Sequence, residues 1–118
     1  MTLANDYAGL TDAARAFLNG RKMLFIDGEW QAPAAGRYAP IVDPSHGGAV
    51  TEAALADAGD VDRAVRAARR AFVEGPWPAM RPHQREAVML RLAELIDAET
   101  ETLAQIETVS SGKLIQNT

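Results

Sequence analysis

The chain has 118 residues, of which 47% are hydrophobic and 24% are charged, and its formal net charge is -4. This composition is ordinary for one small globular domain, and the acidic balance disfavours nucleic acid and anionic membrane surfaces as partners. The sequence has no cysteine, which excludes disulfide bonds, thiolate metal sites and a cysteine nucleophile within these residues.

Targeting signals do not stand out in the sequence. No stretch approaches the roughly 20 apolar residues that a membrane-spanning helix needs. The opening MTLANDYAGL lacks the basic stretch followed by an apolar run that marks a secretory signal. We therefore expect a cytoplasmic protein.

The first predicted element is a short helix over residues 11–19, TDAARAFLN. Thr11 can cap its N-terminus and Gly20 can end it. One face carries the apolar side chains, so the helix is expected to lie on a surface; these are Ala14, Phe17 and Leu18. We expect a loose end before this helix, because no periodic segment precedes it.

Short extended segments follow. Residues 23–31 predict a two-stranded hairpin, because the tight-turn dipeptide Asp27-Gly28 separates two strand-like runs. A third extended piece, RYAPIVDP at 37–44, and a fourth, AVTEAAL at 49–55, are separated by a glycine turn. These strands have no obvious partner in a central sheet, and an isolated two-stranded ribbon is only marginally stable in water.

From Asp57 the hydrophobic period becomes helical. Asp57 is the predicted N-cap, with Asp60 three residues later completing a capping box. The apolar stripe recurs at spacings of four, three and four; it consists of Val61, Val65, Ala68 and Phe72. Asp62 and Arg66 have the i,i+4 spacing of an ion pair.

Four arginines, at positions 63, 66, 69 and 70, cover the solvent side of this helix. A basic helix raises the question of phosphate binding. Acidic side chains interleave with the arginines, however, so the pattern is more typical of a solvated face.

A proline-rich break, EGPWPAMRP at 74–82, ends the helix. Pro82 suits the first position of the next helix, although Arg81 is a poor cap. The apolar stripe of that helix consists of Val88, Leu92, Leu95 and Ile96. A further helix of about three turns, carrying Leu103 and Ile106, is expected to end at Gly112.

No residue in this chain is predicted to be catalytic, cofactor-binding or metal-binding. His46 and His83 are 37 residues apart, and neither is predicted to be a ligand or a catalyst. None of the serines lies in a Gly-x-Ser-x-Gly elbow, and Ser-Gly-Lys at 111–113 lacks the upstream glycine of a P-loop. The carboxylates lie on helix faces rather than as an acid and base pair.

Five pieces nevertheless occur in a recognisable order: FIDGEW, VDP with its glycine turn, DVDRAVRAARRAF, GPWPAM and LRLAELIDAETETLAQIETVSSGK. Together they resemble the N-terminal portion of the aldehyde dehydrogenase superfamily, the NAD(P)-dependent enzymes that oxidise aldehydes to carboxylic acids. The resemblance covers residues 23–113. No single piece identifies the family, but five pieces in the family's order and at about its spacings are specific for it.

The resemblance implies an α/β fold: a short β-hairpin arm followed by three amphipathic helices that flank a missing Rossmann-like domain. Residues 1–22 would be an N-terminal extension with a short helix, and 23–118 an incomplete N-terminal part of the domain. The family's nucleophilic cysteine, glutamate base, glycine-containing cofactor motif and oxyanion-hole asparagine lie far beyond position 118. Thr118 is therefore expected to be a cut, and this chain alone is expected to be inactive.

For the complete enzyme, the resemblance implies NAD or NADP as cofactor, an aldehyde substrate and a homodimer or homotetramer. The sequence names neither the aldehyde nor the choice between the two cofactors. An alternative from a different class is a non-catalytic interaction module that associates through its β arm and helix faces.

Many family members hold a structural monovalent cation, using the carbonyl before an Asn-Pro or Asp-Pro step and an aspartate ahead of Gly-Lys. Val42 occupies the carbonyl position here. Ser110 occupies the aspartate position, so a neutral hydroxyl replaces a charge and we do not predict a cation site. Two further departures are Leu114, where proline is common, and Arg81, where a capping serine is usual.

Overall fold

The computed structural model describes residues 7–117 of the chain. Its elements, in chain order, are α1 (Asp12–Asn19), β1 (Leu24–Ile26), β2 (Glu29–Gln31), β3 (Tyr38–Val42), β4 (Ala49–Ala54), α2 (Ala58–Glu74), the 3-10 turn η2 (Trp77–Ala79), α3 (Pro82–Ala98), α4 (Thr100–Ser111) and the 3-10 turn η3 (Ile115–Asn117). This order confirms the predicted β arm followed by three helices.

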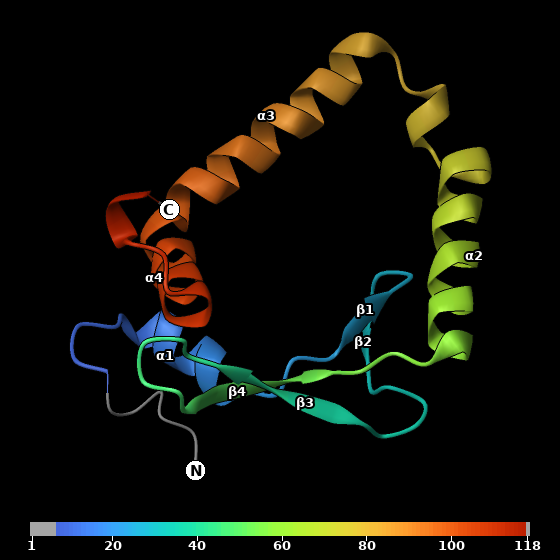
Figure 1. Ribbon diagram of the computed structural model, residues 1–118. Helices are drawn as coiled ribbons and strands as arrows, with labels where there is room; N and C mark the ends of the chain where they lie inside the picture. Colours follow the sequence, from blue (N-terminus) through green and yellow to red (C-terminus); the bar gives the residue numbers. More distant parts are fainter. Residues whose placement is uncertain (1–6, 118) are drawn as a thin grey trace.

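The molecule is open rather than rounded. Helices α2, α3 and α4 form an arc, and β3 and β4 run between its two ends (Figure 1). The radius of gyration is 17.3 Å, whereas a compact domain of this length has about 13.5 Å. The accessible surface is 8281 Å², against about 6200 Å² for a compact protein of this mass. Much apolar surface is therefore left uncovered.

The first hairpin forms as its turn dipeptide predicts. Strands β1 and β2 pair antiparallel, with Phe25 opposite Trp30. Asp27 and Gly28 both adopt positive φ, 57° and 84°, the combination that a two-residue type I′ turn requires. The two aromatic rings lie side by side with centroids 4.9 Å apart.

The second ribbon is a separate sheet, as expected. Strands β3 and β4 pair antiparallel, with a register shift between Ile41 and Val42. The backbone of Lys22 covers the outer edge of β4: its N–H donates to the Glu52 carbonyl at 2.7 Å, and its carbonyl accepts from the Ala54 N–H at 2.8 Å. This short bridge pairs part of the exposed edge of β4 and so stabilises the ribbon.

The helix ends follow local rules. The Thr11 hydroxyl accepts from the Ala14 N–H at 3.2 Å, and Asp57 with Asp60 forms the predicted capping box. Arg81 gives α3 no side-chain cap, and the Gln84 side chain instead accepts from its N–H at 2.8 Å.

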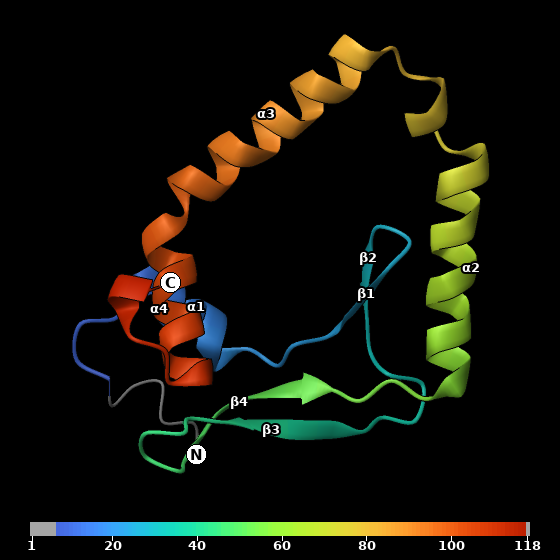
Figure 2. The same ribbon diagram turned by 45° about the horizontal axis from the view of Figure 1, so that its top comes forward.

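The described core is small and lies where α1, β4 and α4 meet. Leu18, Val50 and Val109 form its buried cluster, and Tyr7 and Leu10 pack against it. In Figure 2, α1 lies beside α4 at the end of the arc. The expectation of a loose end before α1 is wrong for residues 7–11, because Tyr7 and Leu10 pack against this core and the Thr11 N–H donates to Gln105. Residues 1–6 lie outside the described part of the chain.

Candidate functional site

The most buried polar cluster lies in the turn between β3 and β4. The Asp43 side chain is 2% exposed and accepts a hydrogen bond from the Tyr7 hydroxyl. The Ser45 N–H donates to its Oδ1 at 2.7 Å, and Nδ1 of His46 lies 2.8 Å from its Oδ2. The bond from Tyr7 and then the His46 contact hold the pKa of Asp43 well below its usual range.

An aspartate beside a histidine is a common catalytic pair, but this one lacks the rest of a site. His46 is mostly exposed, and its ring lies edge-on to that of Tyr7, with the centroids 5.8 Å apart. Among residues 7–117, no cluster of three or more histidine, cysteine or carboxylate side chains could hold a metal ion. The cluster joins segments that are distant in the sequence, because Asp43 of the turn accepts a hydrogen bond from Tyr7. Asp43 was assigned no role from the sequence, although its three-residue spacing to His46 is visible there.

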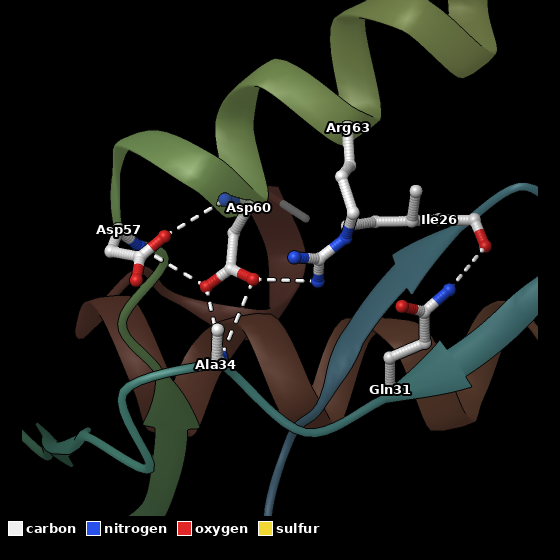
Figure 3. Close-up of polar contacts among 6 residues, drawn as sticks. All are labelled: Ile26, Gln31, Ala34, Asp57, Asp60 and Arg63. Atoms are coloured by element: carbon white, nitrogen blue, oxygen red, sulfur yellow. Dashed lines mark hydrogen bonds and ion pairs between the residues drawn. The ribbon is translucent and has the colours of Figure 1, made fainter.

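A second buried carboxylate organises the start of α2 (Figure 3). The Asp60 side chain is 1% exposed and accepts from the backbone N–H of Asp57 at 3.1 Å and of Ala34 at 3.1 Å. Arg63 donates to it at 2.7 Å. These donors lower the pKa of Asp60, the Asp57 N–H most of all. The capping box was predictable, whereas the contact with Ala34 was not.

A shallow depression of about 360 Å³ lies between α2 and the β1–β2 hairpin. Three arginines line it, but each is matched by an aspartate: Arg63 with Asp60, Arg66 with Asp62, and Arg70 with Asp27. The local charge is therefore balanced, which disfavours an anion site. The predicted pair of Asp62 and Arg66 is confirmed.

The remaining residues considered from the sequence, His83 and Ser110, lie on different helices. His83 is exposed at the start of α3. The Ser110 hydroxyl donates to the Ile106 carbonyl of its own helix at 2.8 Å. The end of α4 does meet the turn after Val42, because a Cβ on Gly112 would lie 2.7 Å from Cγ of Pro44. The structure thus brings the two segments together, while the expectation of no cation stays a prediction.

The most extensive functional feature is apolar. On α2, the buried residues are Asp60 and Ala67, and Ala67 lies beside the β1–β2 hairpin in the wall of a groove. Of the predicted stripe, Ala68 also lines this groove. Val61, Val65 and Phe72 point elsewhere, because Ala67 lies well over 100° around the helix from each of them, at about 100° per residue. Phe72 is 70% exposed.

Helix α3 is uncovered along its whole length. All of α3 is described, and it contains no buried residue. Its predicted stripe is about half exposed throughout; we call these residues, Val88, Leu92, Leu95 and Ile96, the apolar face of α3. Large uncovered apolar surfaces mark sites where other protein binds. The geometry therefore indicates a docking surface.

Comparison with known proteins decides the family. The model of the aldehyde dehydrogenase family matches residues 30–118, more than half of the chain. This chain belongs to the aldehyde dehydrogenase family. The resemblance to the N-terminal portion of these enzymes, and the fold that it implied, are confirmed.

Individual aldehyde dehydrogenases match closely. The chain is 44% identical over 93 residues to aldehyde dehydrogenase family 2 member B4, mitochondrial, of Arabidopsis thaliana, covering 79% of this chain and 17% of that protein. An NAD-dependent aldehyde dehydrogenase from Sinorhizobium meliloti superposes with a TM-score of 0.79 at 40% identity, covering 84% of this chain and 20% of that one. The NAD+ complex of the Bacillus cereus aldehyde dehydrogenase superposes with a TM-score of 0.86 at 36% identity, covering 91% of this chain and 22% of that one. The chain thus spans about a fifth of the length of these relatives.

Proposed function

We propose that this chain is the N-terminal structural segment of an NAD(P)-dependent aldehyde dehydrogenase. Residues 23–118 would belong to the enzyme domain, and residues 1–22 would be an N-terminal extension. The complete enzyme would oxidise an aldehyde to a carboxylic acid through a cysteine thiohemiacetal, with hydride transfer to NAD(P)+ and hydrolysis of the thioester. The segment would contribute shape and binding surface, and other parts of the enzyme would contribute the chemistry.

The observation that carries this proposal is the uncovered α3. A helix with an apolar face of several large side chains gains its stability mainly by burying that face. Here the face is bare from Val88 to Ile96, so it fits a molecule in which more protein lies against the arc. The close match to the same region of aldehyde dehydrogenase structures, with TM-scores of 0.79 and 0.86, supports the same interpretation.

We propose that the chain by itself is inactive, because it contains no cysteine to attack the aldehyde. Purified chain mixed with an aldehyde and NAD+ should produce no NADH, as followed by absorbance. Aldehyde-dependent NADH formation that persists after further purification would contradict this part of the proposal.

A chimaera tests the structural role directly. Residues 7–117 would replace the matching segment of the Bacillus cereus aldehyde dehydrogenase, and aldehyde-dependent NADH formation would be measured. We expect an active, folded enzyme, because the segment would supply the same docking surface. A chimaera that folds but shows no activity would argue against the proposal.

Two matched variants of the chimaera identify the docking face. Leu92 lies on the apolar face of α3, whereas Leu90 is 60% exposed and lies about 160° away around the helix. Leu92→Asp should abolish folding or activity, because it would bury a charge. Leu90→Asp should leave both nearly unchanged. Equal effects of the two substitutions would show that this face is not the one covered.

The alternative function, a non-catalytic interaction module, is favoured by the same exposed apolar side chains. Sedimentation and hydrogen exchange of the isolated chain separate the two proposals. A monomer with well-protected amides throughout supports an autonomous module. Aggregation, or weak protection confined to α2 and α3, supports a segment that needs the rest of an enzyme.

The remaining expectations belong to the same proposal. The complete enzyme would use NAD or NADP and would form a homodimer or homotetramer in the cytoplasm. Two of the solved relatives support NAD, because the Sinorhizobium meliloti enzyme is NAD-dependent and the Bacillus cereus enzyme forms a complex with NAD+. Within residues 7–117, no helix has both the length and the apolar character to cross a membrane.

A further inference from the structure

Residues 7–20 precede the stretch that the family model matches, residues 30–118. They nevertheless occupy a central place in the fold. This segment contains α1 and lies between α4 and the β3–β4 ribbon, at one end of the arc (Figures 1 and 2). We call residues 7–20 the N-terminal strap.

The strap is hydrogen-bonded to α4 through one side chain. Gln105 is 6% exposed, and its Oε1 accepts from the Thr11 N–H at 2.8 Å. Its Nε2 donates to the Gly9 carbonyl at 3.3 Å. A buried amide that satisfies both a backbone donor and a backbone acceptor fixes the position of the segment it contacts.

Both ends of the strap are attached to the β3–β4 ribbon. At one end, the Tyr7 hydroxyl donates to the buried Asp43 of the turn. At the other end, the Gly20 carbonyl accepts from the Thr51 hydroxyl of β4 at 2.9 Å. An internal bond, from Arg15 Nη2 to the Tyr7 carbonyl at 3.1 Å, holds the start of the strap against α1.

The strap also supplies the central side chain of the core. Leu18 of the strap is buried together with Val50 of β4 and Val109 of α4. Three elements that are far apart in sequence therefore meet at one strap residue. Along the chain, by contrast, β4 and α4 are connected through α2 and α3, and α3 has no buried residue.

We propose that residues 7–20 act as an intramolecular strap that holds α4 against the β3–β4 ribbon. This end of the arc is then preformed before any other protein covers α2 and α3. The strap itself rests on contacts within this chain, whereas its benefit for docking rests on the proposed function. Preorganisation of this kind lowers the entropic cost of docking the uncovered helices.

Hydrogen exchange on the full chain, read segment by segment, tests the strap. In the unmodified chain, amides of α4 should exchange more slowly than those of α3. Gln105→Ala should accelerate exchange in α4 and in the strap by roughly tenfold, because the Thr11 N–H and the Gly9 carbonyl lose their partner on α4. Tyr7→Phe, which keeps the ring but removes the bond to Asp43, should accelerate exchange in the same two segments to a smaller extent.

The matched control is Gln31→Ala. The Gln31 side chain also donates to a backbone carbonyl, that of Ile26 at 3.0 Å, but within the β1–β2 hairpin. This substitution should accelerate exchange in the hairpin and leave α4 unchanged. The proposal is overturned if α4 is unprotected in the unmodified chain, or if Gln105→Ala, Tyr7→Phe and removal of residues 1–20 all leave its exchange unchanged. An inactive chimaera would affect only the proposed function.

Discussion

The two ends of the arc differ in how much apolar surface they bury. At one end, α1, β4 and α4 enclose Leu18, Val50 and Val109, and two polar side chains, Asp43 and Gln105, are buried with partners. At the other end, α2 meets the β1–β2 hairpin through Ala67, and its larger apolar side chains remain uncovered. Helix α3 joins the two ends and has no buried residue at all.

This difference shows that helix formation and helix burial are separate requirements. All four α-helices carry apolar side chains, but α1 and α4 bury larger ones than α2, which buries Ala67, while α3 buries none. A helix such as α3 is marginal in water until its face is buried. The contrast between the ends fits the proposal that one part of the segment is self-supporting and that the other is covered by additional protein.

The largest expected effect comes from a cavity in the core between α1, β4 and α4. Leu18→Ala should destabilise α1 and α4 by about 2–5 kcal/mol, because a buried leucine leaves a cavity. The matched change at the uncovered helix, Leu90→Ala, should cost no more than about 0.5 kcal/mol. Segment-resolved hydrogen exchange measures both. Similar losses at the two positions would contradict the division into two regions.

The second largest effect is expected from acid, which should destabilise the end of the arc that contains Asp43. The pKa of Asp43 lies below its unfolded value of 3.8, so its ionised form stabilises the fold. That contribution is fully present above about pH 4 and is lost as the pH falls further and the carboxylate is protonated. Exchange or circular dichroism across pH 2–7 checks this. Asp43→Asn should flatten the acid response around the β3–β4 turn, while the response at α2, where the pKa of Asp60 is also lowered, should persist.

A glycine substitution tests the contact between α4 and the turn. Gly112 has a φ of 74°, and an added Cβ would lie 2.7 Å from Cγ of Pro44. Gly112→Ala should therefore cost about 1–2 kcal/mol from the backbone, with a further loss from the steric contact. Gly36 has a similar φ of 63° with no atom within 4 Å of such a Cβ. Gly36→Ala isolates the backbone contribution, and equal melting shifts for the two would mean that the contact is unimportant.

The smallest expected effect concerns the solvated arginines of α2. Arg66 pairs with Asp62 while both side chains are more than half exposed, so Arg66→Ala should cost only about 0.2–0.5 kcal/mol. Arg63 pairs with the buried Asp60, so Arg63→Ala should cost more, because it removes a donor from a buried charge. Thermal melts at low and high salt would compare them. A larger, salt-sensitive loss for Arg66→Ala would argue against the solvated-face interpretation.

Local chemistry was readable from the sequence. The turn at Asp27-Gly28, the capping box of Asp57 with Asp60, and the end of α4 at Gly112 were all predicted and are confirmed. Each depends on residues only a few positions apart, so backbone preference and side-chain hydrogen bonding within one turn decide the outcome. The apolar stripe predicted for α2, by contrast, did not identify the side that is buried in this chain, which carries Ala67.

Tertiary structure alone decided which distant segments meet. Tyr7 contacts Asp43 across 36 positions, Ala34 contacts Asp60 across 26, and Thr11 contacts Gln105 across 94. No short-range sequence pattern predicts these pairs, because they form only after whole helices and strands have packed against one another. The sequence likewise predicted an apolar stripe on α3. Only the tertiary structure shows that no described residue buries it.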